Sequence, residues 1–224
     1  MRIWSVLVLG LGGAAILLSL GSWQLRRLAW KEDLLARIET RIAAAPVALP
    51  RAPDPERDRY LAVSAEGHFT GAPLRVQSAR DGQGAGWRIV QRFDTAGRRI
   101  MVDRGFVPQG AEIPEGGAGR VTGNLLWPDE VDAMTPRPDL EDRLFYGRDV
   151  SGMADVLATE PVLLVRRDGA GGGGVLRAAP VGTGGIRNDH KEYAVTWFAL
   201  AAVWLVMTAY LFYRMRKQEK GETS

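Results

Sequence analysis

The chain has two long uncharged, apolar runs, one near each end, and a polar middle. The first covers residues 3–25 and the second covers residues 193–213, and neither contains Asp, Glu, Lys or Arg. A helix rises about 1.5 Å per residue, so about 20 apolar residues cross the roughly 30 Å hydrocarbon core of a bilayer. The pattern therefore predicts two transmembrane helices, at residues 1–25 and 193–213, with a water-exposed region between them.

A cleaved signal peptide is the alternative interpretation of the first run. Such a peptide has an apolar core of about 7–15 residues that ends at a small-x-small site. The run here is longer and no clean site of that kind follows it, so we expect an uncleaved anchor. The short segment before the run leaves no room for an Arg- and Ser-rich organelle transit peptide, which favours a bacterial inner membrane over a mitochondrial one.

Basic residues lie at the end of each run that is nearer the chain terminus. Cations beside a span mark its cytoplasmic side. Arg2 precedes the first run. The second run is followed by Arg214, Arg216, Lys217 and Lys220. Arg26, Arg27 and Lys31 argue for the opposite orientation, but they count less because the segment they open far exceeds the roughly 60 residues over which the rule holds. We therefore expect a multi-pass protein with both termini, including the tail at residues 214–224, in the cytoplasm and the central domain in the periplasm.

The middle of the chain changes pattern twice. Residues 29–45 place apolar side chains on one helical stripe, and prolines between positions 46 and 55 end that helix. Residues 26–59 thus form a helix and a Pro-rich linker. From residue 60 apolar residues recur with a period of two, which is typical of strands. The strands that this period predicts lie at residues 60–66, 74–79, 87–93, 99–103, 121–127 and 162–167.

These elements indicate the fold class. We predict an α+β membrane protein in which two transmembrane helices flank a mainly antiparallel β-barrel or β-sandwich at residues 60–168. A short helix near residues 152–158 would be capped by Ser151. A glycine-rich loop and tether at residues 169–192 would lead back to the membrane.

Charge and composition exclude several functions. The net charge is +3, and the two tails carry five cations and two anions, so residues 26–192 are electrically neutral. The excess positive charge therefore lies in the tails, where it indicates membrane orientation. We expect no nucleic-acid partner, because binding nucleic acid would need a basic patch on the domain. The chain has no cysteine, which excludes disulfides, Cys–zinc sites and a cysteine nucleophile.

No motif for catalysis stands out, and we expect a protein that is not an enzyme. The glycines of residues 82–86 invite a phosphate-loop interpretation, but this segment opens no helix, so a hairpin turn is the better interpretation. There is no GK[ST] loop, HExxH helix or nucleophile elbow.

His190 and His68 are the two histidines of the chain. On a helix, His190 shares a face with Tyr193 and Trp197, at the lip of the second span. An imidazole among aromatic rings at a membrane surface suits a haem held edge-in, with its iron on the ring nitrogen. The alternative is a polar interfacial residue that caps the helix. His68 would be solvated, because Phe69 beside it is expected to point inward.

Three segments carry a resemblance to a known family. Residues 20–31 (LGSWQLRRLAWK) are similar to L-G-x-W-Q-x-x-R-x-x-W-K, residues 102–108 (VDRGFVP) to V-N-R-G-W-V-P, and residues 188–197 (NDHKEYAVTW) to N-x-H-x-x-Y-A-x-x-W. With a G-x-F strand at Gly67 and Phe69, they resemble the surfeit-locus family of cytochrome c oxidase assembly factors, of the bacterial haem a-binding type. Asp103 replaces the family's usual Asn, and Phe106 its usual Trp.

The resemblance implies a function in late biogenesis of the oxidase. It implies that the chain binds haem a as cargo and assists its delivery to oxidase subunit I, with haem A synthase as a further partner. The family's second-span histidine, matched by His190, is the expected iron ligand. Around it we expect a cofactor-binding set of Tyr193, Trp197, Trp23, Trp30, Arg26 and Arg27. The alternative is a scaffold that binds no haem and stabilises an oxidase assembly intermediate.

The charge pattern makes a topology prediction. Reporter fusions at Gly172 are expected to report the periplasm, and fusions after Lys220 the cytoplasm. The reason is that basic residues lie at the end of each uncharged run that is nearer the chain terminus. Paired alkaline phosphatase and fluorescent-protein fusions measure this. A cytoplasmic signal at Gly172 would overturn the orientation.

Overall fold

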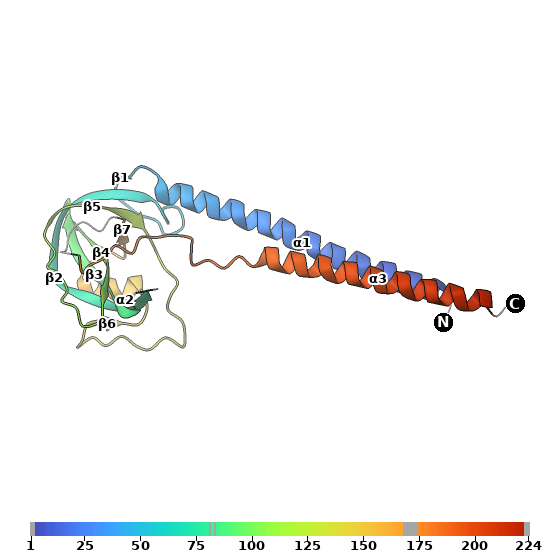
Figure 1. The fold of residues 1–224 in the computed structure, drawn as a ribbon. Helices are drawn as coiled ribbons and strands as arrows, with labels where there is room; N and C mark the ends of the chain where they lie inside the picture. Colours follow the sequence, from blue (N-terminus) through green and yellow to red (C-terminus); the bar gives the residue numbers. More distant parts are fainter. Residues whose placement is uncertain (1–2, 81, 83, 168–173, 222–224) are drawn as a thin grey trace. The chain divides into compact units, whose positions relative to one another are not determined.

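A computed structural model describes residues 3–80, 82, 84–167 and 174–221 of the chain. Residues 169–173 of the predicted glycine-rich loop and tether, including Gly172, lie outside the described residues, as do Arg2 and the last three residues of the tail. The chain divides into two compact units (Figure 1). Residues 1–37 and 184–224 form a helical unit, and residues 38–183 form a sheet domain.

Three helices and seven strands make up the described chain. Their bounds in chain order are α1 (Ile3–Ala43), β1 (Val47–Ala48), β2 (Ala62–Arg80), β3 (Gly84–Thr95), β4 (Arg98–Pro108), β5 (Ala118–Leu125), β6 (Leu144–Phe145), α2 (Val150–Leu157), β7 (Leu163–Arg166) and α3 (His190–Gly221).

The helical unit consists of α1 and α3, which run antiparallel (Figure 1). Both helices are long and apolar enough to span a membrane, over residues 4–43 and 190–218. The first predicted span and the predicted helix at residues 29–45 are one uninterrupted helix, because no proline or glycine breaks the pattern between them. α1 ends at Ala43, three residues before Pro46, where the sequence placed the stop.

Small residues let the two helices approach closely. A methyl group added at Gly10 would lie 2.0 Å from Thr208, one at Gly13 would lie 2.6 Å from the Trp204 ring, and one at Gly21 would lie 2.8 Å from Phe198. The facing alanines Ala14, Ala194 and Ala201 are buried. The Gly10 and Ala14 pair of the first span therefore serves close helix packing, which is how small residues at a four-residue spacing work in membrane helices.

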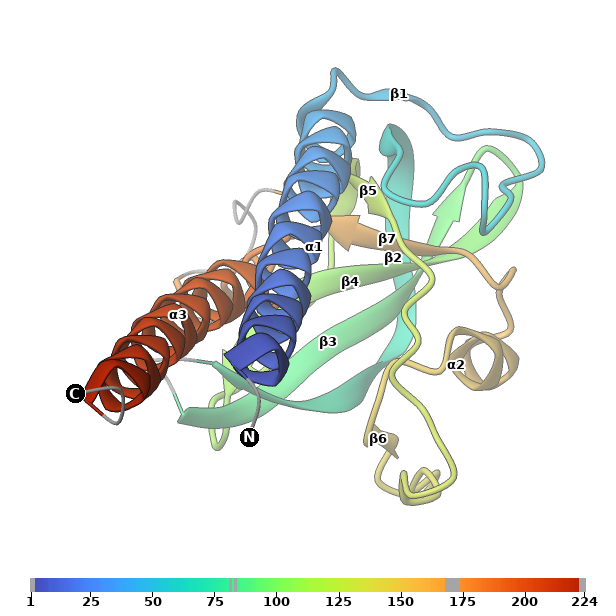
Figure 2. The same cartoon turned by 90° about the vertical axis from the view of Figure 1, so that its right-hand side faces the viewer.

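The sheet domain holds one mixed sheet (Figure 2). Its three long pairings, β2 with β3 and β5, and β3 with β4, are antiparallel, and so is the short pairing of β5 with β7. Three short pairings are parallel, namely β1 and β6 with β2, and β4 with β7. The hydrogen-bonded path from β2 through β3, β4, β7 and β5 returns to β2, so β2 has partners on both sides.

The period-two pattern located most of this sheet. The segments predicted at residues 87–93, 99–103, 121–127 and 162–167 overlap β3, β4, β5 and β7. The two segments predicted at residues 60–66 and 74–79 are a single strand, β2, whose pairing with β3 shifts register between Thr70 and Leu74. That irregularity carries Gly71 and Pro73, which the sequence pattern took for the end of a strand. The glycines at 82–86 do join two antiparallel strands, because Arg80 pairs with Gly84.

The short helix α2 begins two residues earlier than expected. Its N-cap is Asp149, not Ser151: the Asp149 backbone is extended, and its carboxylate accepts a hydrogen bond from the Gly152 N–H at 3.0 Å. An N-cap side chain reaches the N–H two or three residues ahead, and Asp149 meets that geometry. The buried residues of α2 are Val150, Met153, Ala154 and Leu157, the spacing of one helix face.

Apolar side chains are buried on both faces of the sheet. One cluster packs under α2 and consists of Leu74, Val76, Val90, Met101, Leu126, Phe145, Val150, Met153, Ala154, Leu157, Leu163 and Val165. The other consists of Val63, Ala65, Phe93, Ile100, Val102, Val121, Leu125, Val162 and Leu164. Successive residues of β7 contribute to opposite clusters, which explains its unbroken apolar run.

The helix packing can be tested with two neighbouring glycines. Gly13→Leu is expected to destabilise the helical unit by about 1–3 kcal/mol, because the new side chain would overlap Trp204 in a filled contact. Gly12→Leu is the matched control, since a Cβ at Gly12 meets nothing within 4 Å. Thermal unfolding of the full chain in detergent measures both. Equal midpoints for the two variants would contradict the packing described here.

Candidate functional site

The start of α3 is held in place by contacts from the residues before it and from α1. The Tyr193 N–H donates to the Asp189 carbonyl at 3.2 Å, which closes the first turn of the helix. The Asp189 carboxylate lies 2.6 Å from the Arg187 guanidinium and raises the pKa of Arg187, first by a hydrogen bond and then by its charge. The Lys31 ammonium of α1 donates to the Arg187 carbonyl. These contacts place His190, the first residue of α3, beside α1.

His190 contacts a buried amide on α1. Its ring atom Nδ1 lies 2.8 Å from Oε1 of Gln24, which is 8% exposed. An amide oxygen only accepts hydrogen bonds, so Nδ1 carries the proton in this arrangement. In the neutral imidazole, the other ring nitrogen, Nε2, then keeps its lone pair. A histidine whose Nδ1–H is fixed by a neighbour in this way is the usual form of a metal-ligating imidazole.

Gln24 is the functional residue that the sequence interpretation missed. It lies on the packed stripe of α1, three residues after Gly21, and its burial against α3 follows from that position. Two signals could have identified it. It is the only side-chain amide within residues 3–25, and it belongs to the W-Q pair of the first motif.

The predicted aromatic and basic residues lie on the same two helices as this contact, each within about two helical turns of His190 or Gln24. Tyr193, Trp23 and Trp30 are about half exposed, and Trp197 is partly buried. The Arg27 guanidinium carbon lies 4.0 Å from the centre of the Trp30 ring, a cation–π contact, and Arg26 is exposed. Among the described residues, no hydrogen bond or ring contact joins these aromatics to His190. The site therefore offers one oriented imidazole with apolar rings and cations nearby on the same helices.

His68 lies elsewhere, on β2 in the sheet domain. It pairs with Asp94 across the strands and is exposed, while the Phe69 ring packs against Phe93 with centroids 4.9 Å apart. The expectation that His68 is solvated and Phe69 turned inward is confirmed.

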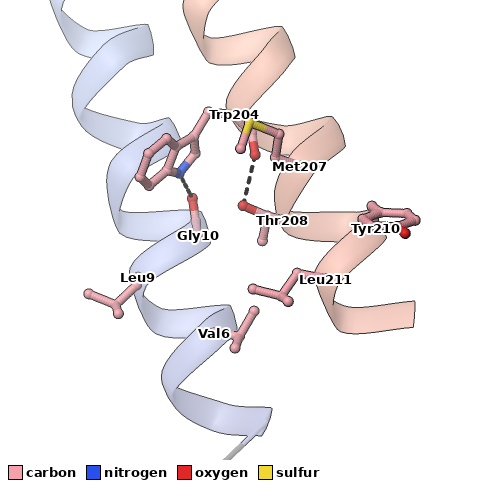
Figure 3. Close-up of a pocket in the computed structure, with 8 residues that line it drawn as sticks. All are labelled: Val6, Leu9, Gly10, Trp204, Met207, Thr208, Tyr210 and Leu211. Atoms are coloured by element: carbon pink, nitrogen blue, oxygen red, sulfur yellow. Dashed lines mark hydrogen bonds between the residues drawn. The ribbon is translucent and has the colours of Figure 1, made fainter. Parts of the chain in front are cut away.

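An apolar groove of about 370 Å³ lies between α1 and α3 away from His190 (Figure 3). In it the Trp204 indole N–H donates to the Gly10 carbonyl at 2.9 Å. Its α3 residues run from Trp204 to Leu211, which places them roughly 20–30 Å from His190 at the helical rise per residue. The groove is thus a separate feature from the His190 contact.

The sheet domain carries a buried ion-pair network at the second motif. Asp103 is fully buried, 2.6 Å from the Arg88 guanidinium and 3.8 Å from that of Arg148. Burial lowers the pKa of Arg148, but Glu130 and Asp103 outweigh it and raise the pKa above its usual value. Burial raises the pKa of Glu130, but its hydrogen bonds with Arg148 and the charges of Arg148 and Arg88 outweigh burial and hold that pKa below its usual range. Asp103 in place of the family's usual Asn therefore supplies a charge that two arginines compensate.

The fold and the site define a class: a protein in which two terminal helices of membrane-spanning length flank a mixed-sheet domain, with a single oriented imidazole at the start of the second helix. The family model of the SURF1 family matches residues 11–202. The chain belongs to the SURF1 family, whose members are oxidase assembly factors.

Curated relatives agree with this assignment. The chain is 31% identical over 230 residues to "Surfeit locus protein 1" of Rattus norvegicus, covering 87% of this chain and 70% of the relative. It is 29% identical over 226 residues to the Homo sapiens protein of that name, covering 87% and 72%. It is also 29% identical over 221 residues to the "SURF1-like protein" of Monosiga brevicollis, covering 86% and 82%. The resemblance found from the motifs is confirmed.

The hydrogen bond to Gln24 predicts the tautomer of His190. In a His68→Ala background His190 is the only imidazole, and its ¹⁵N spectrum is expected to show the neutral Nδ1–H form. Gln24→Leu is expected to move it toward the Nε2–H form, because the acceptor at Nδ1 is lost. Ser22→Ala, which removes an exposed hydroxyl two residues away, is the control. An unchanged tautomer in Gln24→Leu would show that Gln24 does not orient the ring.

Proposed function

We propose that this protein binds haem a as cargo through His190 and assists its delivery to subunit I of cytochrome c oxidase. The observation that carries the proposal is the contact between His190 Nδ1 and Gln24 Oε1. Membership of a family of oxidase assembly factors supports a function in oxidase assembly. The proposal assigns the protein a carrier function in which no bond of the cargo is made or broken.

The donor set fits a haem. Haem iron takes one or two axial ligands from the protein, and a single neutral imidazole is a common one. His190 meets this requirement because Gln24 holds its Nδ1–H and leaves Nε2 free to bind iron. Such a site needs no cluster of His, Cys, Asp or Glu, and the described residues contain none of the kind that would hold a bare metal ion.

The surroundings of His190 suit the two chemical faces of a haem. The apolar porphyrin ring is favourably removed from water, whereas removing the two propionate carboxylates from water is unfavourable. The half-exposed rings of Trp23, Trp30 and Tyr193 offer apolar surface near the ends of the membrane-spanning segments. Arg26 and Arg27 supply guanidinium groups that pair with carboxylates in bidentate geometry.

The isoprenoid tail of haem a belongs in lipid under this proposal. The groove between α1 and α3 begins roughly 20 Å along the helices from His190. A tail anchored at His190 meets the bilayer before it reaches that groove. We therefore assign the groove no part in holding the cargo.

We place the protein in a bacterial inner membrane, and the charge pattern supports an orientation with the sheet domain in the periplasm and His190 at the periplasmic face. Haem A synthase would then be the donor of the cargo and oxidase subunit I its acceptor. An assembly scaffold that binds no haem is the competing function, and the same experiment separates the two.

The test is haem retention by three variants. Each is purified from cells that make haem a and measured by optical absorption and a pyridine haemochrome assay. His190→Ala is expected to lose the bound haem while the protein still inserts into the membrane. Gln24→Leu is expected to weaken retention about tenfold, the usual cost of removing an outer-shell partner of a ligating histidine.

His68→Ala is the matched control and is expected to retain full haem, because His68 is exposed on the sheet domain. Loss of haem in His68→Ala with full retention in His190→Ala would move the site to the sheet domain. Full retention in both would exclude histidine ligation, since the chain has no third histidine. Absence of haem from the unaltered protein would favour the scaffold.

A further inference from the structure

A second cavity, in the sheet domain, is lined by arginines. It has a volume of about 310 Å³ and is walled by Arg104, Arg120, Arg166, Phe69, Val121 and the backbone of residues 116–119. Among the residues that the structure describes, three arginines and no Asp or Glu contribute to this wall. A cavity with one sign of charge and low-dielectric walls attracts ions of the opposite sign.

Arg104 is the central cation of this cavity. It is 2% exposed, and its two terminal nitrogens donate to the Gln91 side-chain oxygen at 2.8 Å and to the Glu115 carbonyl at 3.0 Å. Both acceptors are neutral. The Nε of Arg104 is buried with no hydrogen-bond partner, and Arg104 forms no ion pair with any carboxylate in the described part of the chain.

The fold holds Arg104 in this position. Val90 pairs with Asp103 and Arg88 with Phe106, so Ile89 alone faces both Arg104 and Gly105, which form a bulge in β4. A bulge redirects side chains locally. It is possible here because Gly105 has φ +125°, and a Cβ at that position would lie 2.3 Å from the Arg177 carbonyl. Gln91 is oriented in turn, since its amide N–H₂ donates to the Gly71 carbonyl at 2.7 Å.

The buried positive charge of Arg104 is energetically unfavourable without a counter-ion. Burial lowers the pKa of Arg104, and the nearby charge of Arg166 lowers it further. A buried cation left unpaired is costly, and proteins keep such groups where they bind something. The Phe69 ring, 5.1 Å from the Arg104 guanidinium carbon, contributes a cation–π contact but no full negative charge.

Two glycines, Gly116 and Gly117, form part of the cavity wall without a side chain. A Cβ at Gly116 would lie 2.4 Å from the Phe69 Cβ and 2.9 Å from the Gln91 side-chain oxygen. A Cβ at Gly117 would meet nothing within 4 Å. Gly116 thus lets the loop pass against Phe69, and Gly117 faces open space. Arg120 lies at the exposed rim, where Glu66 already pairs with it.

We propose that this cavity binds an oxyanion, the carboxylate or phosphate group of a small ligand, between Arg104 and Arg166. Arginine is the side chain best suited to planar, bidentate binding of such groups. Arg104 provides a buried cation at the cavity wall, and Arg166 provides a second cation on the adjacent wall. The site is distinct from the His190 contact because it lies wholly within residues 38–183.

The test uses the full chain in detergent, without haem. Sodium phosphate and sodium acetate are titrated separately at constant ionic strength set with chloride, and binding is measured by calorimetry and by the thermal midpoint. We expect at least one oxyanion to bind saturably and to raise the midpoint, because a ligand that binds only the folded state stabilises it. Phosphate alone would identify a phosphorylated ligand, acetate alone a carboxylate, and both the oxyanion class in general.

Three variants assign the site. Arg166→Gln is expected to weaken binding about tenfold, the factor that corresponds to one charge-assisted hydrogen bond. Arg104→Met is expected to abolish it. Arg51→Gln, which removes an equal charge from an exposed position of the same domain, is expected to leave it unchanged.

Arg166→Gln decides the test if Arg104→Met fails to fold, because Arg166 is only partly buried. No saturable binding of either anion above chloride would overturn the proposal. So would equal affinities in the unaltered protein, Arg166→Gln and Arg51→Gln, since binding would then not depend on this cavity.

Discussion

The candidate site depends on the close approach of α1 and α3. Two apolar helices in lipid gain nothing from hiding apolar surface from each other, so they associate through close backbone packing and interhelical hydrogen bonds. Gly10, Gly13 and Gly21 provide that packing along one stripe of α1. The stripe ends at Gln24, and His190 meets it there. If the two helices packed less closely, the Gln24 amide would lose its hydrogen-bond partner and the His190 ring would be free to rotate. Neither side chain is oriented by its own helix alone.

The sheet domain treats two adjacent buried charges in opposite ways. Asp103 is compensated by Arg88 and Arg148, and the structure gains a cross-strand network from it. Arg104 has neutral acceptors and an unpartnered Nε. The bulge formed by Arg104 and Gly105 begins directly after Asp103 and turns Arg104 toward the cavity. Retaining a buried cation of this kind costs stability, and a bound anion would offset that cost.

The three motifs of the family differ in what they contribute. The first and third, residues 20–31 and 188–197, meet in the contact between Gln24 and His190. The second, residues 102–108, lies on β4 and organises the interior of the sheet domain. Pro108 ends β4 and Gly105 has positive φ, so both residues shape this strand. Arg104 has more than a folding function under the proposal made above, because it is the residue of this motif that lines the arginine cavity.

Local periodicity determined the parts of this protein that a short stretch of chain can specify: the two apolar helices, the positions of the longer strands and the hairpin near Gly84. Burial on one or two faces imposes those periods on the sequence directly. Only the tertiary structure decided features that need a distant partner. The two-residue strands β1 and β6 exist because β2 lies beside them, and β2 continues through Gly71 and Pro73 because β3 pairs on both sides of the irregularity. Likewise Gln24 gains its function from His190, whose place in the sequence is far away but whose helix packs against it, and no periodic pattern encodes which side chains two packed helices bring together.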